Sequence, residues 1–240
     1  GVTTLELDQI AEKTIRDGGG RPNFQLVPGY YHTICASINS EVVHGIPSNK
    51  ALEAGDLISI DCGAEVDGWN GDSAFSMVVP GLENDLTRQR QLQSDVCEGS
   101  LWAGIAALAT AKRLNEVGTA VEKHNRGKGR YGILQEYVGH GIGRSMHEDP
   151  PVFNYKTKVA GPHVVPGLVI AIEPMVTAGS ARTHVLEDEW TVSSTDGSDA
   201  SHWEHSIAVH EKGIWVLTAT DGGAVKLAPF GIVPVDPRNI

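Results

Sequence analysis

The pattern of apolar and polar positions predicts helices that alternate with pairs of strands. The first helix has apolar residues every three or four positions, at Leu7, Ile10, Ala11 and Ile15. A capping box of Thr3 and Glu6 begins it, and Gly18-Gly19-Gly20 ends it. A longer helix is predicted from about Asp85 to Leu108, with an inner face of Leu92, Val96, Leu101, Ile105 and Leu108. Another helix is predicted from about Leu114 to Asn125.

Runs rich in β-branched residues predict strands between these helices. Residues 33–43 read as β-structure with a turn at Asn39-Ser40, and residues 57–65 and 69–79 form a hairpin around Val66-Asp67-Gly68. In the second half we expect a strand over 168–177, a hairpin around 185–192, and a strand over 202–210 that pairs with 214–218.

Two apolar segments far apart in the chain have nearly the same pattern, and each ends on an acid. Residues 54–61 end at Asp61 and residues 166–173 end at Glu173. A second acid follows each on the returning strand, Asp72 in the first half and Glu204 in the second. The hairpin is expected to bring Asp61 and Asp72 opposite each other on one face, and the segment around His140 echoes the one around His44.

This duplication predicts one pseudo-twofold α+β domain over residues 1–220. The second copy has two helices before its histidine and the first copy has one. We therefore expect that a further N-terminal helix is missing before Gly1. Residues 221–240 show no periodic pattern, and we expect an irregular C-terminal extension.

Four acids that converge in a core predict a metal site. Such carboxylates cannot all stay charged unless cations lie between them. His140 adds an imidazole to this oxygen-rich set, which suits a pair of divalent ions such as manganese, iron(II), cobalt or zinc. Two such ions activate water for hydrolysis, and the residues alone leave amides and phosphate esters both open as substrates.

Composition narrows the functional class. The net charge of −11 argues against specific nucleic-acid binding and against an anionic membrane surface, although Arg126, Lys128 and Arg130 form one local basic loop. No apolar run approaches the roughly 20 residues that span a bilayer. Three cysteines without C-x-x-C spacing favour a reducing compartment, and we expect the cytoplasm.

Six motifs resemble those of the type I methionine aminopeptidases, in order from Gly1 to about Leu217. They are His44-Gly45-Ile46-Pro47, Ile60-Asp61-Cys62-Gly63, Gly68-Trp69-Asn70-Gly71-Asp72, Gly139-His140-Gly141-Ile142-Gly143, Ile172-Glu173-Pro174-Met175 and Trp203-Glu204-His205. The resemblance implies the pita-bread fold, also called creatinase/aminopeptidase-like, with a central antiparallel sheet and helices on the outside.

The resemblance also implies roles for the matching residues. Asp61 would chelate one ion, Asp72 and Glu204 would bridge both ions, and His140 and Glu173 would complete the other shell. Glu173 would in addition pass the proton of the attacking water to the leaving amine. An outer pair, His44 and His147, would hydrogen-bond the scissile amide and stabilise the oxyanion.

The methionine pocket is implied in the same way. Its wall would contain Cys35, Tyr30, Met146 and Trp190, with His44 at the substrate. The chain departs from the family at two pocket positions: Val27 stands where an aromatic residue is usual, and Met146 where phenylalanine is more common.

The function implied is removal of the initiator methionine from peptides and nascent chains with a small second residue. The resemblance suggests a monomer, and contact with the ribosome is left open. One alternative is a proline-specific aminopeptidase or prolidase-like peptidase on the same scaffold, which usually carries a large N-terminal domain. A type II methionine aminopeptidase is disfavoured because the segment between Glu173 and Glu204 has no helical insert. The other alternative is a non-catalytic binding module, which should have lost its metal ligands.

Overall fold

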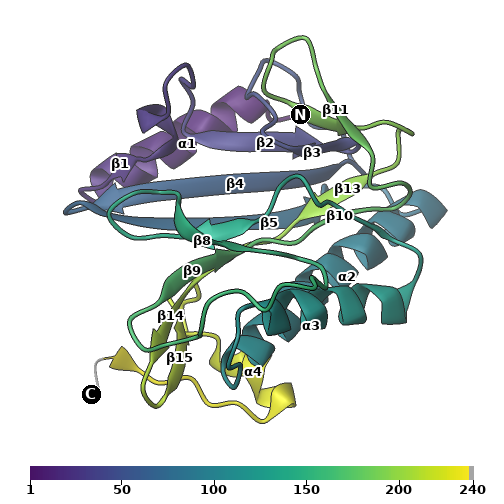
Figure 1. The fold of residues 1–240 in the computed structure, drawn as a ribbon. Coiled ribbons are helices and arrows are strands. Elements are labelled where there is room, and N and C mark those ends of the chain that lie inside the picture. The colour runs from purple at the N-terminus through teal and green to yellow at the C-terminus, as the bar shows by residue number, and fades with distance from the viewer. Residues whose placement is uncertain (238–240) are drawn as a thin grey trace.

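The computed structural model describes residues 1–237. The chain forms two similar sets of strands, one from each half of the sequence (Figure 1). The first half contains α1 (Thr4–Asp17), β1 (Arg21–Pro22), the 3-10 turn η1 (Phe24–Leu26), β2 (Ile34–Ile38), β3 (Glu41–Val43), β4 (Leu57–Val66) and β5 (Trp69–Val78). The second half begins with α2 (Asp85–Leu108), α3 (Asn115–Lys128), β6 (Gly132–Ile133), β7 (Gly139–Gly141), β8 (Glu148–Val152) and β9 (Val169–Ile172). It continues with β10 (Met175–Thr177), β11 (Thr183–Val185), β12 (Val192–Ser194), β13 (Ala200–His202), β14 (His205–His210), β15 (Gly213–Val216), α4 (Ala224–Leu227) and η2 (Ala228–Phe230).

The duplicated pattern corresponds to a duplicated strand order. In the first half β4 lies between β2 and β5, and in the second half β9 lies between β7 and β14, with antiparallel pairing throughout. β7 therefore corresponds to β2 in topology. His140 lies on β7, whereas His44 follows β3, so the echo between their segments is one of sequence and not of strand position.

The predicted hairpin of β4 and β5 is confirmed. Asp67 and Gly68 form a two-residue turn with φ angles of 52° and 79°, the left-handed geometry that suits the twist of paired strands. The turn at Asn39-Ser40 is also confirmed, with Asn39 at φ 57° between β2 and β3. The expected strand over 168–177 is instead two strands, because the chain leaves one sheet at Glu173-Pro174 and enters another.

The helix boundaries agree with the sequence patterns, but two apolar positions do not face the core. α1 has the predicted capping box of Thr3 and Glu6, yet Ile10 is 60% exposed. The buried polar residue Asp8 takes the inner position and accepts hydrogen bonds from the backbone N–H groups of residues 33 and 34. On α2, Leu92 is 56% exposed because Gln93 is turned inward and donates to the carbonyl oxygens of residues 176 and 199.

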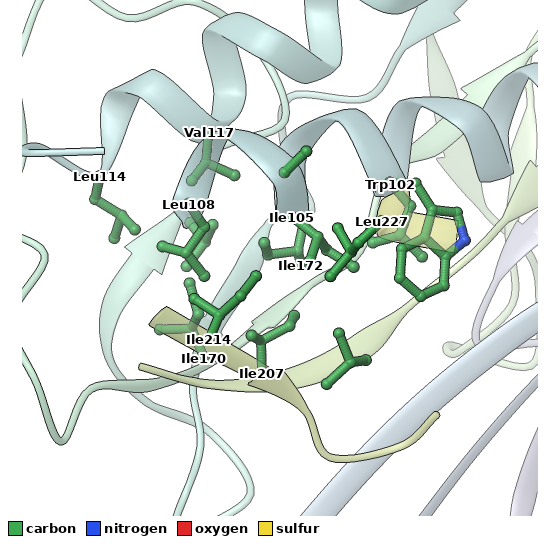
Figure 2. Packing of buried hydrophobic residues seen from close by; sticks show 14 residues of the cluster. Trp102, Ile105, Leu108, Leu114, Val117, Ile170, Ile172, Ile207, Ile214 and Leu227 are labelled. Carbon is green, nitrogen blue, oxygen red and sulfur yellow. The ribbon is translucent and has the colours of Figure 1, made fainter. Parts of the chain in front are cut away.

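The largest apolar core lies between α2, α3 and the sheet that contains β9, β14 and β15 (Figure 2). Among its fully buried side chains are Leu101, Ile105, Leu108, Ile170, Ile172, Ile207 and Ile214. Each such side chain contributes about 1.5–3 kcal/mol when it leaves water. This core supports β9 from the helix side, directly before the chain reaches Glu173.

The C-terminal segment is more ordered than its pattern predicts, so the expectation of an irregular extension from residue 221 is wrong for part of it. α4 and η2 lie within it, and Leu227 is fully buried in the largest core. The Asp221 carboxylate accepts from the backbone N–H groups of Gly223 and Val225 and thereby starts α4. Residues 238–240 lie outside the described residues. Within the described chain, none of the helices combines the length and apolarity needed to cross a bilayer.

Candidate metal centre

The four predicted acids converge from strands of both halves. Asp61 lies in β4 opposite Ala74, and Asp72 lies in β5 opposite Gly63. The prediction that Asp61 and Asp72 lie directly opposite each other is therefore wrong. They are offset by two residues on one face of the hairpin, which still brings their side chains together.

The other two acids lie where strands are interrupted. Glu173 lies between β9 and β10, and its carbonyl oxygen accepts from Asn154 Nδ2 at 3.0 Å. Glu204 lies between β13 and β14, and its backbone forms an isolated bridge with Ala74 of the first half: Glu204 N–H donates to Ala74 O at 2.9 Å, and Ala74 N–H donates back at 3.3 Å. Both carboxylates enter the same cavity as Asp61 and Asp72.

His140 is oriented as a metal ligand. Its Nδ1 lies 2.9 Å from Gly141 O, and because a carbonyl only accepts, Nδ1 carries the proton. The Nε2 lone pair then faces Glu173 Oε1 at 3.5 Å. Burial lowers the pKa of His140, which favours the neutral ring that binds a metal ion.

These residues fit a divalent cation. Ligand atoms of Asp72, His140 and Glu204 lie within 4.8 Å of one another, and all three residues are buried. Within the described chain, Asp61 Oδ1 and Glu204 Oε1 are buried and have no hydrogen-bond partner, although Asp61 as a whole residue is partly exposed. Such orphaned oxygens are costly unless a cation or proton compensates them.

The pKa values of the four acids also indicate a cation site. Burial, together with the neighbouring carboxylates, holds the pKa of Asp61 and Glu204 well above the usual range. Burial raises the pKa of Asp72 and of Glu173 to about 7. Without a cation this cluster therefore holds protons near neutral pH, and a divalent ion would displace them.

The outer histidines line the same cavity as the acids. His147 packs its ring against that of His140 at 4.4 Å between centroids, and His44 packs against Tyr137 at 5.4 Å. Desolvation lowers the pKa of His44 to about 4, and partial desolvation also lowers that of His147, which stays exposed at the mouth. Both rings are thus neutral at pH 7 and each offers one N–H donor.

The cavity that these acids line has a volume of about 160 Å³, and apolar and aromatic side chains line the rest of it. The predicted pocket residues Tyr30, Cys35, Met146 and Trp190 all line it. The Tyr30 hydroxyl donates to Ile34 O at 2.7 Å and lies 3.2 Å from Cys35 Sγ, and its ring meets that of Trp190 at 5.1 Å. Val27 is also in the wall, at the position where the family usually has an aromatic residue.

Sequence analysis missed two residues of this site. Phe24 lines the cavity, contributes an aromatic ring near Val27, and packs edge-on against Tyr30 at 6.3 Å. His202 is only 2% exposed, and its Nε2 lies 3.4 Å from Glu173 Oε2. His202 precedes Glu204 by two residues, but β13 ends at His202, so the alternation of a continuous strand does not predict where its ring points.

Comparison with known proteins gives a consistent family. The model of metallopeptidase family M24 matches residues 1–211. The chain is 47% identical to methionine aminopeptidase 1 of Mycobacterium tuberculosis (strain CDC 1551 / Oshkosh), over 91% of this chain and 83% of that protein. It is 42% identical to methionine aminopeptidase 1 of Bacillus subtilis (strain 168), over 91% of this chain and 86% of that protein.

Solved structures agree. A methionine aminopeptidase from Thermotoga maritima superposes with a TM-score of 0.85 at 34% identity, over 91% of this chain and 86% of that one. A prolidase from Pyrococcus furiosus superposes with a TM-score of 0.68 at 22% identity and shares the fold. This chain covers 56% of that prolidase.

Proposed function

Because this chain is a member of metallopeptidase family M24, we propose that it is a methionine aminopeptidase, which removes the first methionine from peptides and nascent proteins with a small second residue. The observation that carries the proposal is a buried set of carboxylates and imidazoles that shares one cavity of about 160 Å³ with apolar and aromatic side chains. A cavity of this kind receives one apolar side chain, and the adjacent centre hydrolyses the bond that follows it.

We propose two divalent ions, drawn from cobalt, manganese, iron(II) and zinc, with Asp61, Asp72, His140, Glu173 and Glu204 as ligands. Bound ions would lower the pKa of a water molecule and polarise the scissile carbonyl. Glu173 lies beside His140 in the centre, where its carboxylate can take a proton from the nucleophile and return it to the leaving amine. Neutral His44 and His147 donate hydrogen bonds to the amide and to the developing oxyanion.

The cavity wall explains selectivity for methionine. Phe24, Tyr30 and Trp190 present aromatic rings to the cavity, and a thioether makes favourable contacts with such rings. Met146 and Val27 complete the wall with flexible and small apolar groups. An unbranched side chain with sulfur near its end therefore fits better than a branched or charged one.

The setting of the reaction follows from the same site. All five ligands come from one chain, and we propose that the protein acts as a monomer. Cys35, Cys62 and Cys97 are free thiols, which suits the reducing cytoplasm, where nascent chains appear. A contact with the ribosome would bring it to those chains.

The experiment is a comparison of two peptides with metal-free protein reloaded with each ion. Met-Ala-Ser should lose its methionine rapidly, whereas Ala-Pro-Ala should be cleaved slowly. Asp72→Ala should abolish release because one acid of the centre is lost, and Asp95→Ala, on the exposed surface of α2, is the matched control. Faster cleavage of the proline peptide would assign the chain to the prolidase-like alternative, and no cleavage with any ion would favour a binding module.

A further inference from the structure

His202 is a buried imidazole whose Nε2 has no hydrogen-bond partner in the described part of the chain. Its backbone is fixed on both sides. The His202 N–H donates to Ser76 Oγ at 2.9 Å and to Ser59 Oγ at 3.2 Å, and its carbonyl oxygen accepts from Ser76 Oγ at 2.9 Å. The ring therefore has a set place in the core, and an orphaned ring nitrogen there is costly without a partner.

The partner that this nitrogen faces is Glu173. His202 Nε2 lies 3.4 Å from Glu173 Oε2, while His140 Nε2 lies 3.5 Å from Glu173 Oε1. Each oxygen of one carboxylate thus faces one imidazole. These separations exceed those of ordinary N–H···O bonds, about 2.7–3.2 Å. Two atoms that each lie about 2.1 Å from one ion are separated by roughly 3.0–3.4 Å, which matches the observed spacing far better.

Two groups of ligand atoms result. Atoms of Glu173, His202 and Glu204 lie within 4.8 Å of one another, as do those of Asp72, His140 and Glu204. Each group has one imidazole, and Glu204 is common to both. We propose that His202 is an additional ligand of the metal centre and supplies Nε2 to a divalent ion shared with Glu173 and Glu204. The inference rests on the proposed function for the presence of metal.

A second imidazole changes which ions the centre prefers. Imidazole nitrogen suits zinc, cobalt and iron, whereas manganese and magnesium prefer carboxylate and water oxygens. A centre with His140 and His202 on its two sides therefore discriminates more strongly against manganese than a centre with His140 alone. Replacing His202 by an oxygen ligand should weaken that discrimination.

The test is cobalt(II) binding to metal-free protein, followed by calorimetry and by the visible absorption of bound cobalt. His202→Gln keeps a hydrogen-bond donor for Glu173 but removes the imidazole. It should weaken the binding of one cobalt ion by at least about tenfold and change the absorption spectrum, and it should lower the preference for zinc over manganese. His205→Gln is the matched control, because His205 faces away, with its Nδ1 2.8 Å from Thr218 Oγ1 and its ring on Trp102.

The possible results distinguish failure of the ligand role of His202 from failure of the proposed function. Cobalt affinities and spectrum in His202→Gln equal to those of the parent protein would overturn the ligand role and leave His202 as a residue that only positions Glu173. If circular dichroism shows that His202→Gln does not fold, the smaller His202→Asn is measured in its place against the same criteria. If the parent protein binds cobalt through His202 but releases no methionine, the proposed function fails and this inference stands. If it releases methionine while His202→Gln binds cobalt unchanged, this inference alone fails.

Discussion

Glu204 owes its position to its backbone, because its main chain pairs with Ala74 across the two halves. The carboxylate is thereby carried into a space already occupied by Asp61, Asp72 and Glu173, where burial and then these neighbouring acids raise its pKa. A single residue at such a position has two stable states, protonated or metal-bound. The balance between them is set by pH and by metal concentration.

Metal affinity should therefore rise with pH. The pKa of Asp72 and of Glu173 is about 7 in the metal-free protein, so both lose protons when an ion binds at lower pH. Between pH 6 and pH 8 the apparent affinity should increase by at least about tenfold and then level off. Calorimetry in buffers of different ionisation enthalpy would count the protons released. Affinity that is flat over this range would contradict the raised values.

His44 should matter for turnover and not for metal content. His44→Ala removes the neutral imidazole that is proposed to donate to the scissile amide, and kcat should fall about 10²-fold while the bound metal is retained. The measurement is methionine release together with metal analysis of the same sample. His184→Ala, at an exposed position of β11, is the control. Full turnover in His44→Ala would remove His44 from the reaction.

Asp61 and Glu173 were predictable because each ends a distinctive apolar segment that recurs, and Asp72 and Glu204 because each follows on the returning strand. His202 was not, because it ends β13 while Glu204 lies in the gap before β14, and these strands belong to different sheets. No local pattern shows which way the ring turns at such a break. Phe24 was missed for a related reason, since its 3-10 turn has no period that identifies an inward side.

At the scale of elements, the tip of the β4–β5 hairpin is hydrogen-bonded to the loop that leads to His147. Arg144 Nη1 donates to the carbonyl oxygens of Asp67 and Gly68 at 3.1 and 3.2 Å, and its guanidinium lies 3.9 Å from the centre of the Trp69 ring. Asn70 N–H donates to Gly143 O at 2.8 Å. A hairpin of the first half thereby holds the loop of the second half that carries Met146 and His147.

Removal of the Arg144 contacts with the hairpin should impair catalysis without loss of metal. Arg144→Ala should lower kcat about three- to tenfold, because small displacements of a catalytic group are expensive, while the metal content stays unchanged. The change should largely disappear in a His147→Ala background, since non-additivity marks residues that act through each other. Arg88→Ala, an exposed arginine paired with Asp85, is the control. Additive effects of the two substitutions would show that Arg144 does not act through His147.

Element boundaries were largely predictable, because capping boxes and turn residues act locally. The side of each helix that faces the core was harder to predict. Asp8 and Gln93 are buried because they satisfy backbone groups of neighbouring strands, and those strands are far away in the sequence. Ile10 and Leu92 are displaced outward as a result. α4 was missed because a single turn that buries Leu227 is too short to show a helical period.

At the scale of the whole molecule, the two halves are joined by polar contacts at the centre. Besides the Glu204–Ala74 bridge, Ser206 Oγ donates to Asp72 O at 2.8 Å and accepts from Asp72 N–H at 3.0 Å. The Glu204–Ala74 bridge and the Ser206–Asp72 hydrogen bonds together fix the positions of Glu204 and Asp72 relative to each other. The pseudo-twofold scaffold was predictable from the repeated segments, but these contacts were not, because they join residues that the repeat does not relate.

Metal should stabilise the entire fold. An ion present at a hundred times its dissociation constant adds about 2.7 kcal/mol to the free energy of unfolding if it does not bind the unfolded chain. Chelation should therefore lower the urea midpoint, and readdition of cobalt or zinc should restore it.

Ser206→Ala should in addition cost about 1–3 kcal/mol, since it leaves the buried N–H of Asp72 without its partner. Ser145→Ala, on an exposed loop, is the control. A midpoint of the parent protein that is independent of metal would contradict the idea that the cation compensates the acids.

The membership of Glu204 in both ligand groups has a thermodynamic consequence. In the proposed two-ion centre this shared carboxylate would link the two occupancies, because the ion that arrives first fixes a group that the second must also use. The sign of this cooperativity decides the form in which the protein works when metal is scarce. With positive coupling, molecules are either empty or fully loaded; with negative coupling, a singly loaded form predominates over a broad range of concentration.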